Sequence, residues 1–133
     1  MVRGMEELDE KKSILIIDDE KNICRTLTLI FNKIGYHVET VKTGNKALEK
    51  IHKRFFDIAL IDIKLPDIEG IELISPLRKI HPSMELIMIT GQGSMETAIS
   101  ALNKSETYYI TKPLNMDDVL VKIKDLLKSR TQL

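Results

Sequence analysis

The sequence predicts an α/β domain with a doubly wound parallel sheet. Short apolar segments, each about the length of a buried strand, recur along the chain. Segments with the helical spacing of apolar residues separate them. Five strand–helix units in strict alternation imply a parallel sheet with helices on both faces. The 133 residues suit one domain, which we place at 13–130 after a polar tail at 1–12.

Five segments are predicted as strands, and most are rich in isoleucine, as expected for a sheet covered on both faces. The predicted strands are 14–17, 36–41, 58–61, 86–89 and 108–110, of which 36–41 is the weakest.

Three helices are predicted between the first four strands. Apolar residues step by four, three and four from Ile23 to Ile34, and Gly35 ends that helix. A second helix begins near Thr43, and a third, marked by apolar residues at 71, 74 and 77, ends before Pro82.

Two more helices complete the alternation. Ser94 is the expected N-cap of the fourth, over 94–104. Asn115 is the expected N-cap of the fifth, which carries Asp117 and Asp118 in its first turn and lysines toward its end, as the helix dipole prefers.

Polar residues follow four of the predicted strands. Asp18, Asp19 and Glu20 follow the first strand, and Asp62, Thr90 and Lys112 follow the third, fourth and fifth. The carboxyl ends of parallel strands share one edge of the sheet, where ligand sites form in open α/β folds. Each residue alone is weak evidence for a site, because turn residues are common after strands. Packing does not explain why all of them fall at the same edge of the sheet.

Three carboxylates at one edge repel one another. Two unit charges 4 Å apart repel by ~4 kcal/mol at an effective dielectric constant of 20. A hard cation such as Mg2+ relieves this repulsion and also accepts phosphate oxygens. With the positive charge of Lys112 and the hydroxyl of Thr90, the pattern predicts phosphoryl transfer with an aspartate as the nucleophile.

From about residue 13 to 129 the chain resembles the receiver domains of two-component response regulators. Four motifs carry the resemblance, in order and at the family's separations. They are Ile16-Ile17-Asp18-Asp19-Glu20, Asp62-Ile63-Lys64-Leu65-Pro66 with Gly70 downstream, Thr90-Gly91, and Tyr109-Ile110-Thr111-Lys112-Pro113.

The resemblance implies a five-stranded sheet in the order 2-1-3-4-5 with five helices. It makes Asp62 the phosphoacceptor and assigns Mg2+ to Asp19, Asp62 and the backbone carbonyl of Lys64, with Asp18 holding a metal-bound water.

The resemblance also implies that Lys112 pairs with Asp62 and then with the phosphoryl oxygens, across a cis peptide bond to Pro113. Thr90 would bond a phosphoryl oxygen, and Tyr109 would move from exposed to buried.

The partners that the resemblance implies are a sensor histidine kinase or phosphotransfer protein as donor and a downstream output domain or protein. A phosphorylation-dependent homodimer is a further expectation. The domain would be a signalling module rather than an enzyme, catalysing only its own phosphoryl transfer and dephosphorylation.

Several positions depart from the family's pattern or vary within it. Ser105 and Glu106 stand where the family usually has Gly-Ala, near the segment expected to move. The position of Lys64 varies within the family, and its side chain is expected to change the lifetime of the phosphoryl group.

Other readings fit less well. A haloacid-dehalogenase type of enzyme needs a second aspartate two residues after the nucleophile, where Lys64 stands. A flavodoxin-like electron carrier would have a first loop rich in Ser, Thr and Gly. A degenerate receiver that only docks would not need the intact acidic set and Lys112.

Composition excludes several other classes. Twenty basic and twenty acidic residues give no net charge, so direct binding to nucleic acid or to an anionic membrane is not expected. The single cysteine, Cys24, excludes an internal disulfide and is expected to be a small core residue. No apolar run approaches the ~20 residues of a membrane span, and a cytoplasmic location is expected.

Overall fold

A computed structural model describes residues 11–91 and 107–131. Its five parallel strands form one sheet in the order β2-β1-β3-β4-β5, which confirms the predicted fold class and strand order. The strands are β1 (Ser13–Ile17), β2 (His37–Val41), β3 (Ile58–Asp62), β4 (Glu85–Thr90) and β5 (Tyr108–Thr111). The helices are α2 (Lys21–Ile34), α3 (Gly44–Lys53), the 3-10 helix η1 (Gly70–Leu73), α4 (Ile74–Ile80) and α6 (Met116–Thr131).

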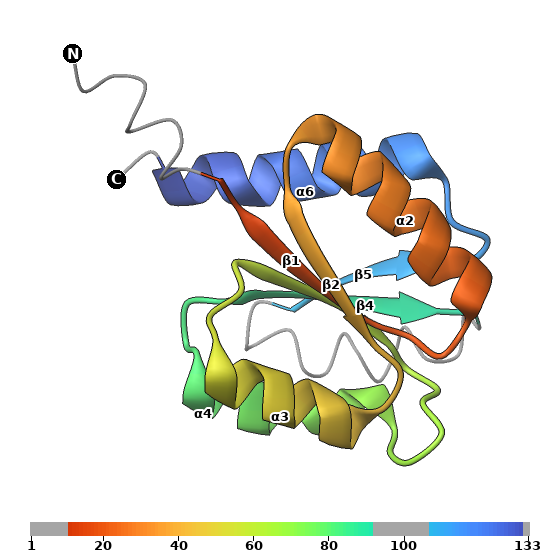
Figure 1. The fold of residues 1–133 in the computed structure, drawn as a ribbon, viewed down its shortest axis with the longest axis vertical. Coiled ribbons are helices and arrows are strands. Elements are labelled where there is room, and N and C mark those ends of the chain that lie inside the picture. The colour runs from red at the N-terminus through yellow and green to blue at the C-terminus, as the bar shows by residue number, and fades with distance from the viewer. Residues whose placement is uncertain (1–10, 92–106, 132–133) are drawn as a thin grey trace.

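The helices cover the sheet from both sides, with α2 and α6 on one face and α3 and α4 on the other (Figure 1). Alternate residues of each strand therefore enter different cores. In β1, Leu15 and Ile17 pack toward α3 and α4, whereas Ile14 and Ile16 pack toward α2 and α6. All four side chains are fully buried, which explains the uninterrupted apolar character of this strand.

Local signals in the sequence account for the helix boundaries. Gly35 ends α2 in the left-handed region at φ 111°, a conformation that costs glycine little. Thr43 caps α3, because its side chain accepts a hydrogen bond from the amide of Lys46. The side chain of Asn115 likewise accepts from the amide of Asp118 in α6.

The third predicted helix starts differently from the expectation. The third begins as the 3-10 turn η1 and becomes α-helical only at Ile74, then ends at Ile80, before Pro82 as predicted. The predicted fourth helix, over 94–104, lies outside the described residues, as do Ser105 and Glu106.

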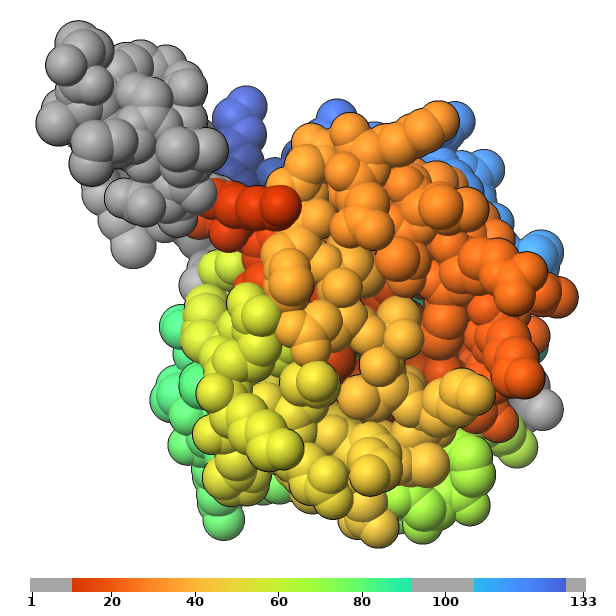
Figure 2. Space-filling view, viewed as in Figure 1, coloured from red at the N-terminus to blue at the C-terminus, as the bar shows by residue number. Residues whose placement is uncertain are grey.

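The edge strand β2 carries a cluster of charged side chains. Glu39 accepts from Lys50 and Arg54, each at 2.8 Å, and its carboxylate lies 2.8 Å from His37. These partners, Lys50 above all, hold the pKa of Glu39 at about 2. Figure 2 shows residues of α2, β2 and α3 forming a continuous surface over this side of the molecule.

Cys24 is half-buried against the core beneath α2, where its thiol donates a hydrogen bond to the backbone oxygen of Asp18 at 3.2 Å. In the described part of the chain, no helix combines the length and apolar character that crossing a bilayer requires.

Candidate functional site

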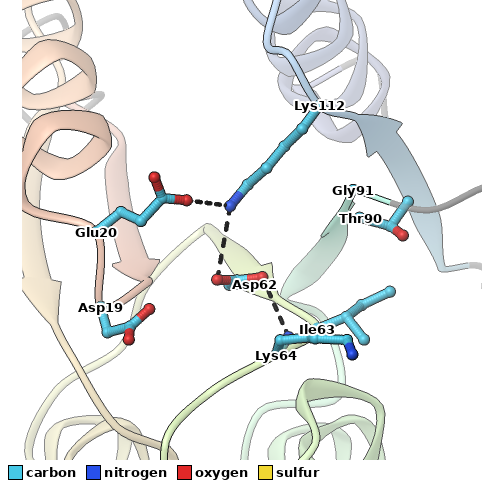
Figure 3. A pocket seen from close by; sticks show the side chains of 8 residues that line it. All are labelled: Asp19, Glu20, Asp62, Ile63, Lys64, Thr90, Gly91 and Lys112. Atoms are coloured by element: carbon cyan, nitrogen blue, oxygen red, sulfur yellow. Dashed lines mark hydrogen bonds and ion pairs between the residues drawn. The ribbon is translucent and has the colours of Figure 1, made fainter.

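The carboxyl ends of four strands surround one polar cavity of about 330 Å³ (Figure 3). The strands β1, β3, β4 and β5 each deliver residues to it, either at their last position or in the loop that follows. The residues that line it are Asp19, Glu20, Asp62, Ile63, Lys64, Thr90, Gly91 and Lys112. The structure thus brings together, at one edge, the residues that the sequence placed after the strands.

Three carboxylates converge beside this cavity. One oxygen from each of Asp18, Glu20 and Asp62 lies within 4.8 Å of the other two. Asp18 is fully buried and Asp62 nearly so, whereas the side chain of Glu20 is half-exposed. The Oδ1 atom of Asp18 accepts from the amide of Glu20 at 2.8 Å, but its buried Oδ2 atom has no hydrogen-bond partner. A buried oxygen left without a donor is costly and calls for a cation or a water.

Lys112 faces the same carboxylates from β5. Its Nζ atom donates to Glu20 Oε1 at 2.5 Å and lies 3.7 Å from Asp62 Oδ2 and 3.9 Å from Asp18 Oδ2. Lys112 therefore forms an ion pair with Asp62, as expected, but its shortest contact is with Glu20. The Lys112-Pro113 peptide bond is cis, as expected.

Sequence reasoning gave Glu20 no role of its own. Its place in the acidic run after β1 was the available signal. Its contact with Lys112 links residues 92 positions apart, so only the fold reveals it.

The electrostatics of the site follow from burial and crowding. Burial, reinforced by the charge of Asp62, raises the pKa of Asp18 to about 6, although the Glu20 amide and Lys112 oppose this. Burial likewise raises the pKa of Asp62. For Lys112, burial disfavours the charged form, but the hydrogen bond to Glu20 and the charges of Asp18 and Asp62 together outweigh it and raise the pKa.

The loop after Asp62 is tightly closed. The amide of Lys64 donates to Asp62 Oδ1 at 3.1 Å, and the amide of Gly70 donates to the carbonyl of Ile63 at 2.6 Å. A Cβ atom at Gly70 would lie 2.3 Å from the carbonyl oxygen of Asp62, so only glycine fits there.

The remaining predicted site residues lie around the cavity. Asp19 is exposed at its rim and does not belong to the close carboxylate trio. Thr90 is buried, and in Figure 3 its hydroxyl is turned away from Asp62. Tyr109 is 36% exposed and does not line the cavity. The amide of Lys112 donates to the carbonyl of Thr90 at 2.7 Å, which couples β5 to β4 at the site.

The donor set fits a divalent cation. Four carboxylates, at positions 18, 19, 20 and 62, lie at or beside a cavity that only two lysines line among the described residues, so the site keeps an excess of negative charge. Oxygen ligands are those that hard cations such as Mg2+ prefer, and the orphaned Asp18 Oδ2 would gain a partner.

The sequence matches the family model for the response regulator receiver domain over residues 14–124. Among solved structures, a response regulator receiver domain protein (CheY-like) from Methanospirillum hungatei JF-1 is 43% identical. It has a TM-score of 0.83 over 90% of this chain and 96% of that chain. The response regulator TrrA from Thermotoga maritima, solved in complex with Mg(2+)-BeF, is 30% identical, with a TM-score of 0.77 over 86% of this chain and 98% of that one.

Curated relatives are longer proteins. The transcriptional regulatory protein ZraR of Klebsiella oxytoca is 31% identical over 118 residues, which are 89% of this chain and 27% of that protein. The regulatory protein VanRc of Enterococcus gallinarum is 32% identical over 117 residues, which are 88% of this chain and 50% of that protein. The chain therefore spans between a quarter and a half of these relatives. Fold, motif order and family match agree: the chain belongs to the response regulator receiver domains, a family of signalling domains.

Proposed function

We propose that Asp62 accepts a phosphoryl group from a phosphohistidine of a sensor kinase or phosphotransfer protein, with Mg2+ as the cofactor. In this transfer, an oxygen of the Asp62 carboxylate forms a bond to phosphorus while the bond from phosphorus to the imidazole nitrogen of the donor breaks. The observation that carries the proposal is that the Nζ atom of Lys112 lies within 4 Å of carboxylate oxygens of both Asp62 and the buried Asp18, and that Asp62 and Lys112 line one cavity.

The proposed metal ligands are the carboxylates of Asp19 and Asp62 and the carbonyl of Lys64, with Asp18 acting through a bound water. The cation would neutralise charge on the transferred group and orient its oxygens. The closeness of Glu20 to Asp18 and Asp62 supports it as a further contributor of negative charge to the ion's surroundings. The structure of the relative TrrA was solved in complex with Mg(2+)-BeF, which supports Mg2+ as the proposed cation of this chain.

Lys112 would balance the charge that arrives. A phosphoryl group adds about −1.5 to −2 charges, by analogy with phosphoserine. The Nζ atom of Lys112 lies 3.7 Å from Asp62, so a small side-chain movement brings it onto a phosphoryl oxygen. Its bond to Glu20 would lengthen or break in that movement.

Thr90 and Tyr109 would carry the event to the surface. The buried hydroxyl of Thr90 would turn toward a phosphoryl oxygen, and Tyr109, which is exposed here, would become buried. Charge-assisted hydrogen bonds of about 1.5–3 kcal/mol each supply most of the ~5.5 kcal/mol that moves an equilibrium from 1:99 to 99:1. A downstream output domain or protein, or a second phosphorylated copy of the chain, would read the new surface.

An intact-mass time course with acetyl phosphate tests the proposal. With Mg2+, the wild type is expected to gain the mass of one phosphoryl group and to lose it slowly when the donor is removed, through its own dephosphorylation. With EDTA, or in Asp62→Asn, no adduct is expected. A persistent adduct in Asp62→Asn, with the fold verified by circular dichroism, would contradict the proposed acceptor.

A further inference from the structure

The loop that carries the proposed Lys64 ligand is closed on itself. We define the acceptor loop as residues 63–70. Lys64 and Glu69 form an antiparallel bridge across it, and the amide of Gly70 donates to the carbonyl of Ile63 at 2.6 Å. The base of the loop is therefore fixed beside Asp62. Its tip requires a separate anchor.

Asp67, at the tip, provides that anchor. Its Oδ1 atom accepts from the amide of Gly44 at 2.9 Å and its Oδ2 atom from the amide of Asn45 at 3.0 Å. These amides belong to the first turn of α3, where backbone donors have no partner within the helix. The two bonds lower the pKa of Asp67, and its charge faces the positive end of the helix dipole.

A second contact independently joins the tip to α3. A Cβ atom at Gly44 would lie 2.3 Å from Cγ2 of Ile68 and 3.4 Å from Cδ2 of Leu73. Ile68 also packs against the core beneath α3 and α4. The tip is therefore seated directly on the first turn of the helix, and glycine at position 44 permits this close approach.

We propose that Asp67 is a positioning residue for the metal site, because it ties the acceptor loop to α3 and thereby holds the backbone carbonyl of Lys64 in place. This inference rests on the proposed function. Asp67 does not touch the reacting atoms; it acts through the loop. Residues that orient metal ligands without contacting the ion typically change metal affinity about 10–100-fold when they are removed.

The same helix supplies a matched control. Thr43 also caps α3, because its Oγ1 atom accepts from the amide of Lys46 at 3.1 Å. Thr43 lies just before the helix, and its capping hydrogen bond is to α3 itself rather than to the acceptor loop. Removing either cap weakens the helix end, but only removal of Asp67 also removes hydrogen bonds between the helix and the acceptor loop.

The experiment measures Mg2+ affinity by isothermal titration calorimetry and the Mg2+ dependence of phosphorylation by acetyl phosphate. Asp67→Ala is expected to raise the Mg2+ dissociation constant and the half-saturating Mg2+ concentration about 10-fold. The limiting rate at saturating Mg2+ should stay close to that of the wild type. Thr43→Ala is expected to leave both Mg2+ values unchanged.

Asp67→Asn separates position from charge. Its amide oxygen still accepts a hydrogen bond from the helix amides, so it should recover part of the lost affinity. The inference is overturned if Asp67→Ala matches the wild type or Thr43→Ala, or if Asp67→Asn is as weak as Asp67→Ala, because surface charge would then explain the effect. A wild-type chain that neither binds Mg2+ nor takes up a phosphoryl group would instead refute the proposed function itself.

Discussion

Neutralising Asp18 should stabilise the metal-free protein, because its ionised form is buried at a cost. Its side chain has no exposure, and Oδ2 has no hydrogen-bond partner. The pKa of this carboxyl rises from 3.8 to about 6 in the folded chain, through burial first and then the charge of Asp62, net of the opposing Glu20 amide and Lys112. About two pKa units correspond to ~3 kcal/mol in the free energy of unfolding.

The sign of the pH dependence follows from linkage. Because the folded pKa is raised, the native state holds this proton more tightly than the unfolded chain between about pH 3.8 and 6. The contribution of Asp18 to stability is therefore greatest at low pH and falls as the pH rises through about 6. At neutral pH, without Mg2+, the wild type carries the full cost.

Urea unfolding in EDTA at about pH 7.5 is the assay. Asp18→Asn is expected to be more stable than the wild type by about 1–3 kcal/mol, since the amide keeps the acceptor for the Glu20 amide and removes a buried charge whose Oδ2 has no hydrogen-bond partner. The gain should shrink toward pH 4, and Mg2+ should stabilise the wild type more than the variant.

Asp19→Asn is the matched control, because it removes an exposed carboxylate from the same acidic run and should change stability much less. The reasoning is refuted if Asp18→Asn is no more stable than the wild type in EDTA at about pH 7.5. It is equally refuted if the difference in stability between Asp18→Asn and the wild type is the same at pH 4 as at about pH 7.5.

Three other predictions follow from the contacts around the sheet. Gly70→Ala should lose about 1–3 kcal/mol or more in urea unfolding, because its Cβ would lie 2.3 Å from a backbone oxygen. Gly91→Ala, whose Cβ would meet no atom of the described residues within 4 Å, should lose far less, and equal losses would contradict this. Glu20→Gln should lower the pKa of Lys112, measured by NMR titration. An unchanged value would show that the hydrogen bond to Glu20 does not raise the pKa of Lys112 in solution. Glu39→Gln should lower the free energy of unfolding by about 1–2 kcal/mol at pH 7, after allowance for solvent screening. Because the pKa of Glu39 is lowered in the folded chain, this loss should fade as the pH falls from 4.5 to 2. A loss that stays constant over this range would contradict the role of the Glu39 charge.

The strands and most helix ends could be predicted because their signals are local. Isoleucine-rich runs mark β1, β3 and β4, and Gly35 and Thr43 bound helices through their own backbone or side chain. The 3-10 start of the third helix was not predicted, since apolar spacing alone does not distinguish the first turn of an α-helix from a 3-10 turn.

The site was predictable in outline for a topological reason. Parallel strands place their carboxyl ends at one edge, so Asp62 and Lys112 meet although 50 positions separate them. Contacts that depend on side-chain reach or loop path were not predictable. Lys112 bonds Glu20 more closely than Asp62, and Asp67 crosses to α3, because the fold sets these distances.

The most direct test of the account locates the phosphoryl group on the chain. After incubation with acetyl phosphate and Mg2+, borohydride trapping followed by peptide mapping identifies the modified carboxylate. The account predicts modification at Asp62 alone, because it is the carboxylate that combines burial, the facing lysine and access to the cavity. Modification at Asp18, Asp19 or Glu20 with Asp62 unmodified would contradict it.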